Sequence, residues 1–155
     1  QTTWAGITID IKATVEEVRT PDEGRPGAER AFVIGFCLGG RMAFLAATLG
    51  LELAGVIGLY GPVVGAGRND APAPIDVVER FEAPVLGLFG GADGSIPAES
   101  VAAFDAALAE AGVERRLITY PDAPHSFFDR KAAEYSQTSA RAWDEILRFV
   151  DVAER

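Results

Sequence analysis

Residues 30–40 read Arg-Ala-Phe-Val-Ile-Gly-Phe-Cys-Leu-Gly-Gly, and this stretch decides the fold that the sequence predicts. Its first half, Arg30 to Gly35, is a short apolar run typical of a buried parallel strand. An alanine-rich segment, residues 41–48, follows the glycines and favours a helix. A strand that turns into a helix at Gly-x-Cys-x-Gly is the context of a nucleophile elbow. We therefore predict that Cys37 lies on a tight, strained turn.

The residues around Cys37 fit such a turn. We expect that Gly35 and Gly39, two positions before and two after the cysteine, must both lack a Cβ atom because the turn brings them together. Cys37 would begin a helix, whose dipole favours the thiolate. The backbone N–H of Leu38 would then point toward an oxyanion that develops during acyl transfer.

Other uses of a glycine-rich loop disagree with the residues present. A dinucleotide-binding loop, G-x-G-x-x-G, needs a glycine where Cys37 stands. A Walker phosphate loop needs lysine and then serine or threonine after its last glycine, but Arg41 and Met42 occupy those positions. The remaining structural alternative is a buried, unreactive cysteine, the usual state of a lone free thiol.

The rest of the chain alternates predicted strands and helices. Further strands are expected over residues 55–60, 84–89 and 114–120, the last of them more polar and nearer the sheet edge. Residues 62–74 are rich in Gly, Pro and Ala and predict a loop. The alternation indicates one α/β domain over residues 1–155, with a parallel sheet and helices on both faces. The helical stripes are Ile11, Val15 and Val18; Val101, Phe104, Leu108 and Ala111, capped by Gly112; and Trp143, Ile146, Leu147 and Val150.

An acid and a histidine follow later strands of this sheet. Asp93 comes just after the third predicted strand, and His125, the only histidine, comes after the fourth. Parallel strands end at one edge of the sheet, so both side chains are expected beside Cys37. Taken singly, Asp93 could be a turn or helix-cap residue and His125 an incidental surface histidine. The order nucleophile, acid, histidine is that of α/β-hydrolases, so together they predict a catalytic triad.

Composition excludes several other classes of protein. The chain has 155 residues and a formal net charge of −9, without a basic cluster, so neither nucleic acid nor an anionic membrane is an expected partner. One cysteine and one histidine are too few for a structural zinc site, and we expect no metal and no cofactor. No segment predicts a membrane span, a disulfide or a signal peptide, so we expect a cytoplasmic protein. Because the first residue is Gln, we expect that the natural start lies elsewhere.

Several motifs together resemble the dienelactone hydrolase family, within the α/β-hydrolases. They are Gly-Phe-Cys-Leu-Gly-Gly at 35–40, Tyr60-Gly61, Gly-x-x-Asp-x-x-Ile-Pro ending at Pro97, Pro-His-Ser-Phe at 124–127, and Trp143. The resemblance implies a Cys37–His125–Asp93 triad, with Leu38 in the oxyanion hole, in a cofactor-free enzyme that hydrolyses lactones or related esters. It covers only the later part of the family fold. The N-terminal strands, a second oxyanion donor and a glutamate that contacts the resting thiol are therefore expected to be absent from this chain.

The resemblance also suggests weaker substrate-contact candidates. Tyr60 and Ser126 match family positions that line the substrate site. The family binds a substrate carboxylate partly through an arginine four residues after the histidine, where this chain has Asp129. Arg130, the next residue, is the candidate that remains for that role.

The chemistry of a cysteine nucleophile limits the substrate independently of the resemblance. A thiolate leaves a tetrahedral intermediate more easily than an alkoxide does, so a plain alkyl ester mostly reverts to substrate. Small activated acyl compounds, such as enol lactones, aryl esters and thioesters, are therefore the expected substrates. Two alternatives remain: a weakly catalytic or non-catalytic binding domain with this fold, and a redox or small-molecule-binding domain of flavodoxin-like topology. The second is disfavoured because there is no second cysteine and no phosphate loop.

The strand from Arg30 to Gly35 predicts a partner. Ala31, Phe32, Val33 and Ile34 are apolar on both faces, as in a central strand, without proline or an inward-pointing charge to protect a free edge. We therefore expect an N-terminal segment or a second chain to pair along it.

Overall fold

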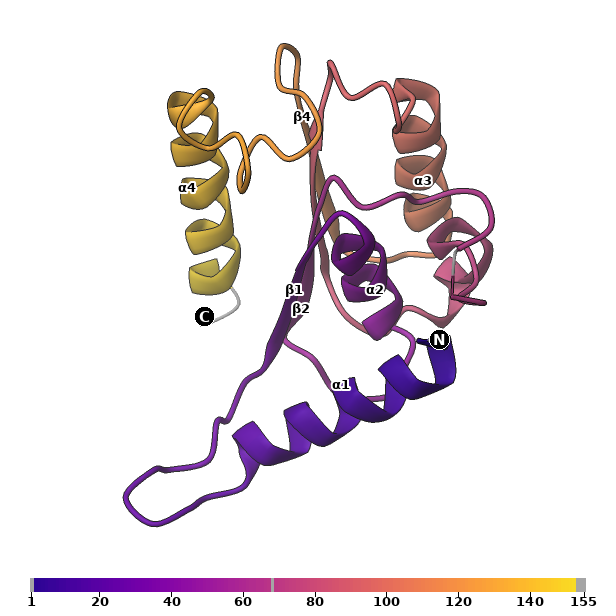
Figure 1. The fold of residues 1–155 in the computed structure, drawn as a ribbon. Helices are drawn as coiled ribbons and strands as arrows, with labels where there is room; N and C mark the ends of the chain where they lie inside the picture. The colour runs from indigo at the N-terminus through magenta and orange to yellow at the C-terminus, as the bar shows by residue number, and fades with distance from the viewer. Residues whose placement is uncertain (1, 68, 153–155) are drawn as a thin grey trace.

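Four parallel strands form the centre of the computed structural model, which describes residues 2–67 and 69–152 (Figure 1). They are β1 (Phe32–Phe36), β2 (Gly55–Leu59), β3 (Val85–Gly90) and β4 (Arg115–Tyr120), and they lie in the order β1-β2-β3-β4. All four predicted strands are thus present within one or two residues of the predicted bounds. Because the strands are parallel, the segments that follow them all emerge at the same edge of the sheet.

Helices cover both faces of the sheet, as the alternation predicts. They are α1 (Trp4–Arg19), α2 (Leu38–Ala46), α3 (Ala98–Glu110) and α4 (Ser136–Val152). Figure 1 shows α2 and α3 on one face of the sheet and α4 on the other, while α1 lies below α2, near the start of β1. The 3-10 helix η1 (Pro74–Arg80) follows the predicted loop and was not expected from the sequence. Gly112, with φ of 71°, ends α3 as its predicted C-terminal cap.

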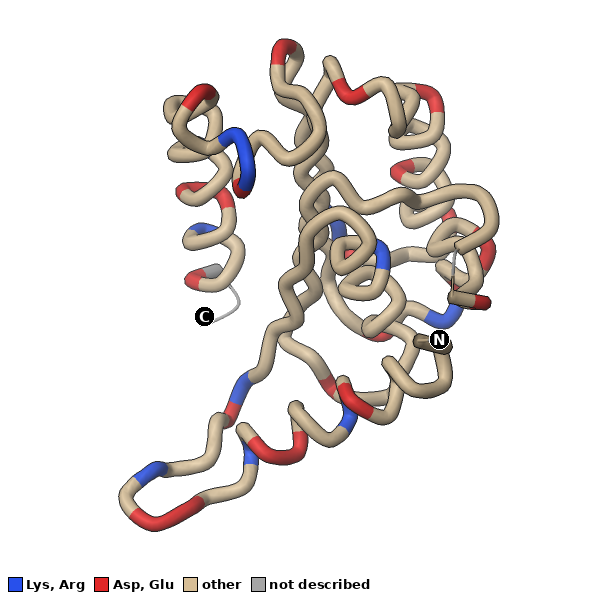
Figure 2. The backbone as a smooth tube through the Cα atoms, in the orientation of Figure 1, with Lys and Arg blue, Asp and Glu red and all other residues tan. Residues whose placement is uncertain are grey.

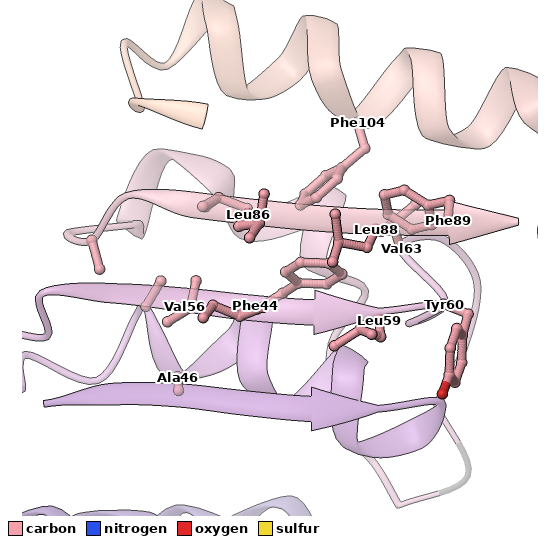
Figure 3. Packing of buried hydrophobic residues seen from close by; sticks show 14 of the residues in the cluster. Phe44, Ala46, Val56, Leu59, Tyr60, Val63, Leu86, Leu88, Phe89 and Phe104 are labelled. Atoms are coloured by element: carbon pink, nitrogen blue, oxygen red, sulfur yellow. The ribbon is translucent and has the colours of Figure 1, made fainter. Parts of the chain in front are cut away.

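A glycine in the middle of the sheet sets the position of α2, the helix that follows Cys37. A Cβ atom on Gly58 of β2 would lie 2.2 Å from Cζ of Phe44, so the bare strand lets this ring lie directly on the sheet. Phe44 also packs against Phe89 and Phe104, with ring centroids 6.2 and 5.4 Å away (Figure 3). Every residue of β2 and β3 is buried. The helix that follows Cys37 is therefore held in place by a fully buried part of the sheet.

The face between β1 and α4 differs from the sequence expectation. Trp143 and Leu147 were predicted to belong to the buried stripe of α4, but Trp143 is 49% exposed and Leu147 is exposed too. Ile146 of the same stripe is buried as predicted, together with Ala142, which was not predicted. Across from it, Ile34 of β1 is 44% exposed. Trp143 contacts only the edge of this region through Phe128, whose ring centroid lies 6.4 Å from that of Trp143 and 5.9 Å from that of Phe36.

Charged positions are spread over the surface rather than gathered on one face. Figure 2 shows Lys and Arg scattered along the chain, with acidic positions between them. In the described ranges, no helix is both long enough and apolar enough to cross a bilayer.

Candidate active site

Cys37 occupies the turn between β1 and α2 with a strained backbone. Its φ and ψ are 54° and −119°, a region that costs a non-glycine residue about 1–3 kcal/mol. Its backbone N–H donates to the carbonyl oxygen of Leu59 at 3.0 Å, which ties the turn to the end of β2. The side chain is exposed. The predicted strained turn is therefore present, and the alternative of a buried, unreactive cysteine does not fit this exposure.

The two flanking glycines have different roles, and the expectation for Gly39 is wrong. A Cβ atom on Gly35 would lie 2.0 Å from the carbonyl oxygen of Gly39, so this position cannot carry a side chain without moving the turn. A Cβ atom on Gly39 would meet nothing within 4 Å, because it would point away from the strand. The second crowded position is Gly40, whose Cβ would lie 2.7 Å from the carbonyl oxygen of Leu59.

This difference predicts opposite outcomes for two similar substitutions. We expect Gly35→Ala to destabilise the protein by more than about 3 kcal/mol, because the backbone of the elbow must shift. Gly39→Ala should be neutral or stabilising by up to about 1 kcal/mol, since alanine favours a helix over glycine. Chemical unfolding of the two variants measures both effects. Equal losses at the two positions would contradict the assignment of the steric contact to Gly35.

Asp93 and His125 meet at the ends of the next strands. His125 Nδ1 lies 2.6 Å from Asp93 Oδ2, in the predicted contact between these side chains. Asp93 is only 5% exposed. Burial alone would raise the pKa of Asp93, but hydrogen bonds from Ser95 and His125 outweigh it, so the pKa is lowered and the carboxylate stays ionised. An ionised acid in this place orients the imidazole and fixes its tautomer.

Ser95 is a supporting residue that the sequence analysis missed. Its backbone N–H and its hydroxyl both donate to Asp93 Oδ1, at 2.9 and 2.6 Å. They hold the carboxylate so that Oδ2 faces His125. The signal was available: an aspartate two residues before a serine is a common pattern for a turn closed by side-chain hydrogen bonds.

The structure shows no hydrogen bond between the Cys37 thiol and His125 among the residues that it describes. Hydrogen bonds of this kind are often long in a resting enzyme and shorten when substrate binds. Tyr60 stands at the end of β2 (Figure 3), and β2 lies between the strands that carry these two residues. The ring centroid of Tyr60 is 5.0 Å from that of His125.

The three weaker candidates have different surroundings. Tyr60 is 0% exposed, and its ring packs against that of His125, so its side chain does not face solvent in this structure. Its hydroxyl donates to Asp129 Oδ1 at 2.9 Å, and burial together with this carboxylate raises the Tyr60 pKa. Ser126 lies half-buried beside His125 with φ of 62°, and Arg130 is exposed.

Leu38 is the first residue of α2, so its backbone N–H has no acceptor within the helix. This leaves the group free for the predicted oxyanion. In the described part of the chain, no group of three or more His, Cys, Asp or Glu residues is placed to hold a metal ion.

Comparison with known proteins gives one consistent result. Residues 1–153 match the model of the dienelactone hydrolase family. A Salmonella typhimurium protein named "Putative carboxymethylenebutenolidase" is 38% identical over 124 residues, which are 79% of this chain and 46% of that protein. A Methylorubrum extorquens protein of the same name is 32% identical over 92% of this chain and 49% of its own length. The chain therefore spans about half the length of these curated relatives.

A solved structure agrees in fold. The crystal structure named "Putative Dienelactone Hydrolase" from Klebsiella pneumoniae superposes with a TM-score of 0.84 at 30% identity. The superposition covers 94% of this chain and 60% of that one. The four-stranded sheet described above is thus part of an α/β-hydrolase fold.

Proposed function

The chain belongs to the dienelactone hydrolase family, and on that premise we propose that it cleaves small activated esters or lactones through Cys37, His125 and Asp93. The observation that supports this most is the 2.6 Å contact between His125 and a buried, ionised Asp93, at the sheet edge where Cys37 forms a strained elbow. Covalent acyl transfer requires an exposed thiol and a histidine that an ionised acid orients, and the chain carries both at this edge of the sheet.

The reaction runs in two steps. His125 accepts the thiol proton, and the Cys37 sulfur attacks the substrate carbonyl carbon to form a tetrahedral intermediate. The Leu38 N–H stabilises its oxyanion, and Asp93 stabilises the imidazolium. The intermediate collapses, the carbon–oxygen bond breaks, and the leaving group takes the proton from His125. Water, deprotonated by His125, then attacks the thioester and releases the acid and the free thiol.

A comparison of leaving groups tests this proposal. We expect the protein at its full natural length to hydrolyse p-nitrophenyl acetate at least about 1,000-fold faster than ethyl acetate in kcat/KM. The thiolate is a better leaving group than ethoxide, so the intermediate from ethyl acetate returns to substrate, whereas p-nitrophenolate departs. Steady-state assays of both esters give the ratio. Similar values of kcat/KM for the two esters would contradict a mechanism in which a cysteine thiolate attacks the ester carbonyl.

A non-catalytic binding domain is the second candidate. The observation that favours it is the missing hydrogen bond between Cys37 and His125 in the described structure. A thiol-reactive aryl ester separates the two: an enzyme turns it over many times, whereas a binding domain releases at most one equivalent of phenolate.

We also propose that an N-terminal segment or a second chain pairs along β1. Ile34 and Phe36 are exposed, although both are apolar side chains of a strand. A groove of about 380 Å³ lies between α1 and β1, lined mainly by apolar residues that include Ile11, Val15 and Val33. Such an unprotected edge favours pairing. A structure of the full-length protein in which the free edge of β1 faces solvent would contradict this.

A further inference from the structure

A second carboxylate, that of Asp129, stands one side chain away from His125. The Tyr60 hydroxyl donates to Asp129 Oδ1 at 2.9 Å, and the Tyr60 ring lies 5.0 Å from the His125 ring. Tyr60 is fully buried, which fixes the carboxylate relative to the histidine. Asp129 itself is exposed, so its charge faces the surface beside the proposed site.

The charge of Asp129 is not used by the proposed mechanism. Asp93 balances the imidazolium that forms on His125, so its charge is compensated during the reaction. Asp129 has no comparable partner: among residues 2–67 and 69–152, no lysine or arginine forms an ion pair with it. Burial alone would raise its pKa, but hydrogen bonds from the Arg130 backbone, Tyr60 and Ser126 lower it, so the group is negative at neutral pH.

We propose that Asp129 makes this site discriminate against substrates that carry a carboxylate, so that neutral and cationic activated esters are its preferred class. The proposal rests on the function proposed above for Cys37. A fixed negative charge near the reacting carbonyl repels an anionic acyl chain and attracts a cationic one. The interaction is only partly shielded, so salt weakens it without abolishing it.

Arg130 is the residue that could oppose this effect. It follows Asp129 directly and is exposed, and among the described residues its side chain forms no ion pair. An exposed, unanchored guanidinium is screened by solvent more than a carboxylate that is held by a buried tyrosine. Asp129 is therefore expected to dominate the local potential.

Alkylation of Cys37 reads this potential without any need for turnover. Cys37 is the only cysteine of the chain, and iodoacetate and iodoacetamide differ chiefly in charge. We expect the ratio of iodoacetamide to iodoacetate rate constants at the Cys37 peptide, followed by mass spectrometry, to fall about threefold or more in Asp129→Asn. Asparagine keeps an oxygen that accepts from Tyr60 and removes the charge. Asp122→Asn, an exposed carboxylate on the same segment, changes net charge equally and should leave the ratio unchanged.

Hydrolysis extends the test to substrates. The p-nitrophenyl esters of hexanoic acid, of adipic acid (one free carboxylate) and of 5-(trimethylammonio)pentanoic acid share a leaving group and a chain length. We expect kcat/KM to decrease from the cationic to the neutral to the anionic ester, by about fivefold at the last step. The differences in kcat/KM among the three esters should become smaller in Asp129→Asn. They should also become smaller for the unsubstituted protein in 0.5 M salt.

The outcomes separate the two proposals. If no ester is hydrolysed but the alkylation ratio shifts as expected, the catalytic proposal fails and the electrostatic role of Asp129 stands. If esters are hydrolysed and the anionic one reacts as fast as or faster than the neutral one, the inference is overturned. Loss of such an anion preference in Arg130→Gln would assign carboxylate binding to Arg130 instead. An alkylation ratio that shifts equally in Asp122→Asn would also overturn it, because the effect would then be one of net charge.

Discussion

Replacing Cys37 with alanine should lower kcat/KM for p-nitrophenyl acetate by on the order of 10³-fold to 10⁴-fold. The substitution removes the atom that forms the covalent bond, while the remaining groups can only bind the ester. Cys37→Ser should lose nearly as much, because serine is far harder to ionise and, in the described structure, no hydrogen bond joins the resting Cys37 side chain to His125. Initial-rate assays of the purified variants measure both losses.

The fold should survive these substitutions. The Cys37 side chain is exposed, and the hydrogen bond that ties the elbow to Leu59 comes from its backbone. Both variants should therefore unfold within about 1 kcal/mol of the parent protein. If Cys37→Ser keeps activity within about threefold, sulfur is not needed for the chemistry and the leaving-group argument fails as well.

Replacing Asp93 with asparagine should cost on the order of 10²-fold to 10⁴-fold in kcat, the second largest loss that we expect. Asparagine is nearly the same size but presents an amide that cannot stabilise an imidazolium. It also favours the wrong tautomer of His125, whose Nδ1 now lies 2.6 Å from the carboxylate. The measurement is kcat across pH for the two proteins. A loss of less than about fivefold at every pH would remove Asp93 from the mechanism.

Ser95→Ala is the matched control for Asp93. It deletes one of two donors to Oδ1 and keeps the backbone N–H bond, so activity should fall by less than about tenfold.

The Asp93 carboxylate also makes the free energy of unfolding depend on pH. Because the pKa of Asp93 in the folded protein is below its usual value, the stabilisation is present above about pH 4 and is lost as the pH falls through the folded pKa. In Asp93→Asn this acid-dependent loss should be smaller.

The parallel sheet and the edge that carries the candidate site could be predicted from the sequence because both follow from local patterns. Apolar runs of five or six residues, separated by helical stripes, fix a parallel sheet. Parallel strands then bring Cys37, Asp93 and His125 to one edge, although they lie far apart in the chain. The strained backbone of Cys37 was predicted from the Gly-x-Cys-x-Gly pattern between a strand and a helix.

Features that depend on packing between distant segments could not be predicted in this way. The turn motif alone does not show which glycine is crowded, because the contact of Gly35 with the carbonyl of Gly39 depends on how the helix leaves the elbow. Trp143 fits an apolar stripe by its spacing, yet burial requires a surface opposite it. The bond between Tyr60 and Asp129 joins residues 69 positions apart and has no sequence signal.

Acid quenching during hydrolysis of p-nitrophenyl acetate, followed by peptide mass spectrometry, tests the covalent role of Cys37 most directly. We predict an added acetyl group on the peptide that contains Cys37, increased in amount at early times and absent from Cys37→Ala. The release of p-nitrophenol should show a matching initial burst if hydrolysis of the thioester is the slower step. An active protein that carries the acetyl group on another residue, or that forms no Cys37 adduct while Cys37→Ala keeps its activity, would contradict a cysteine nucleophile.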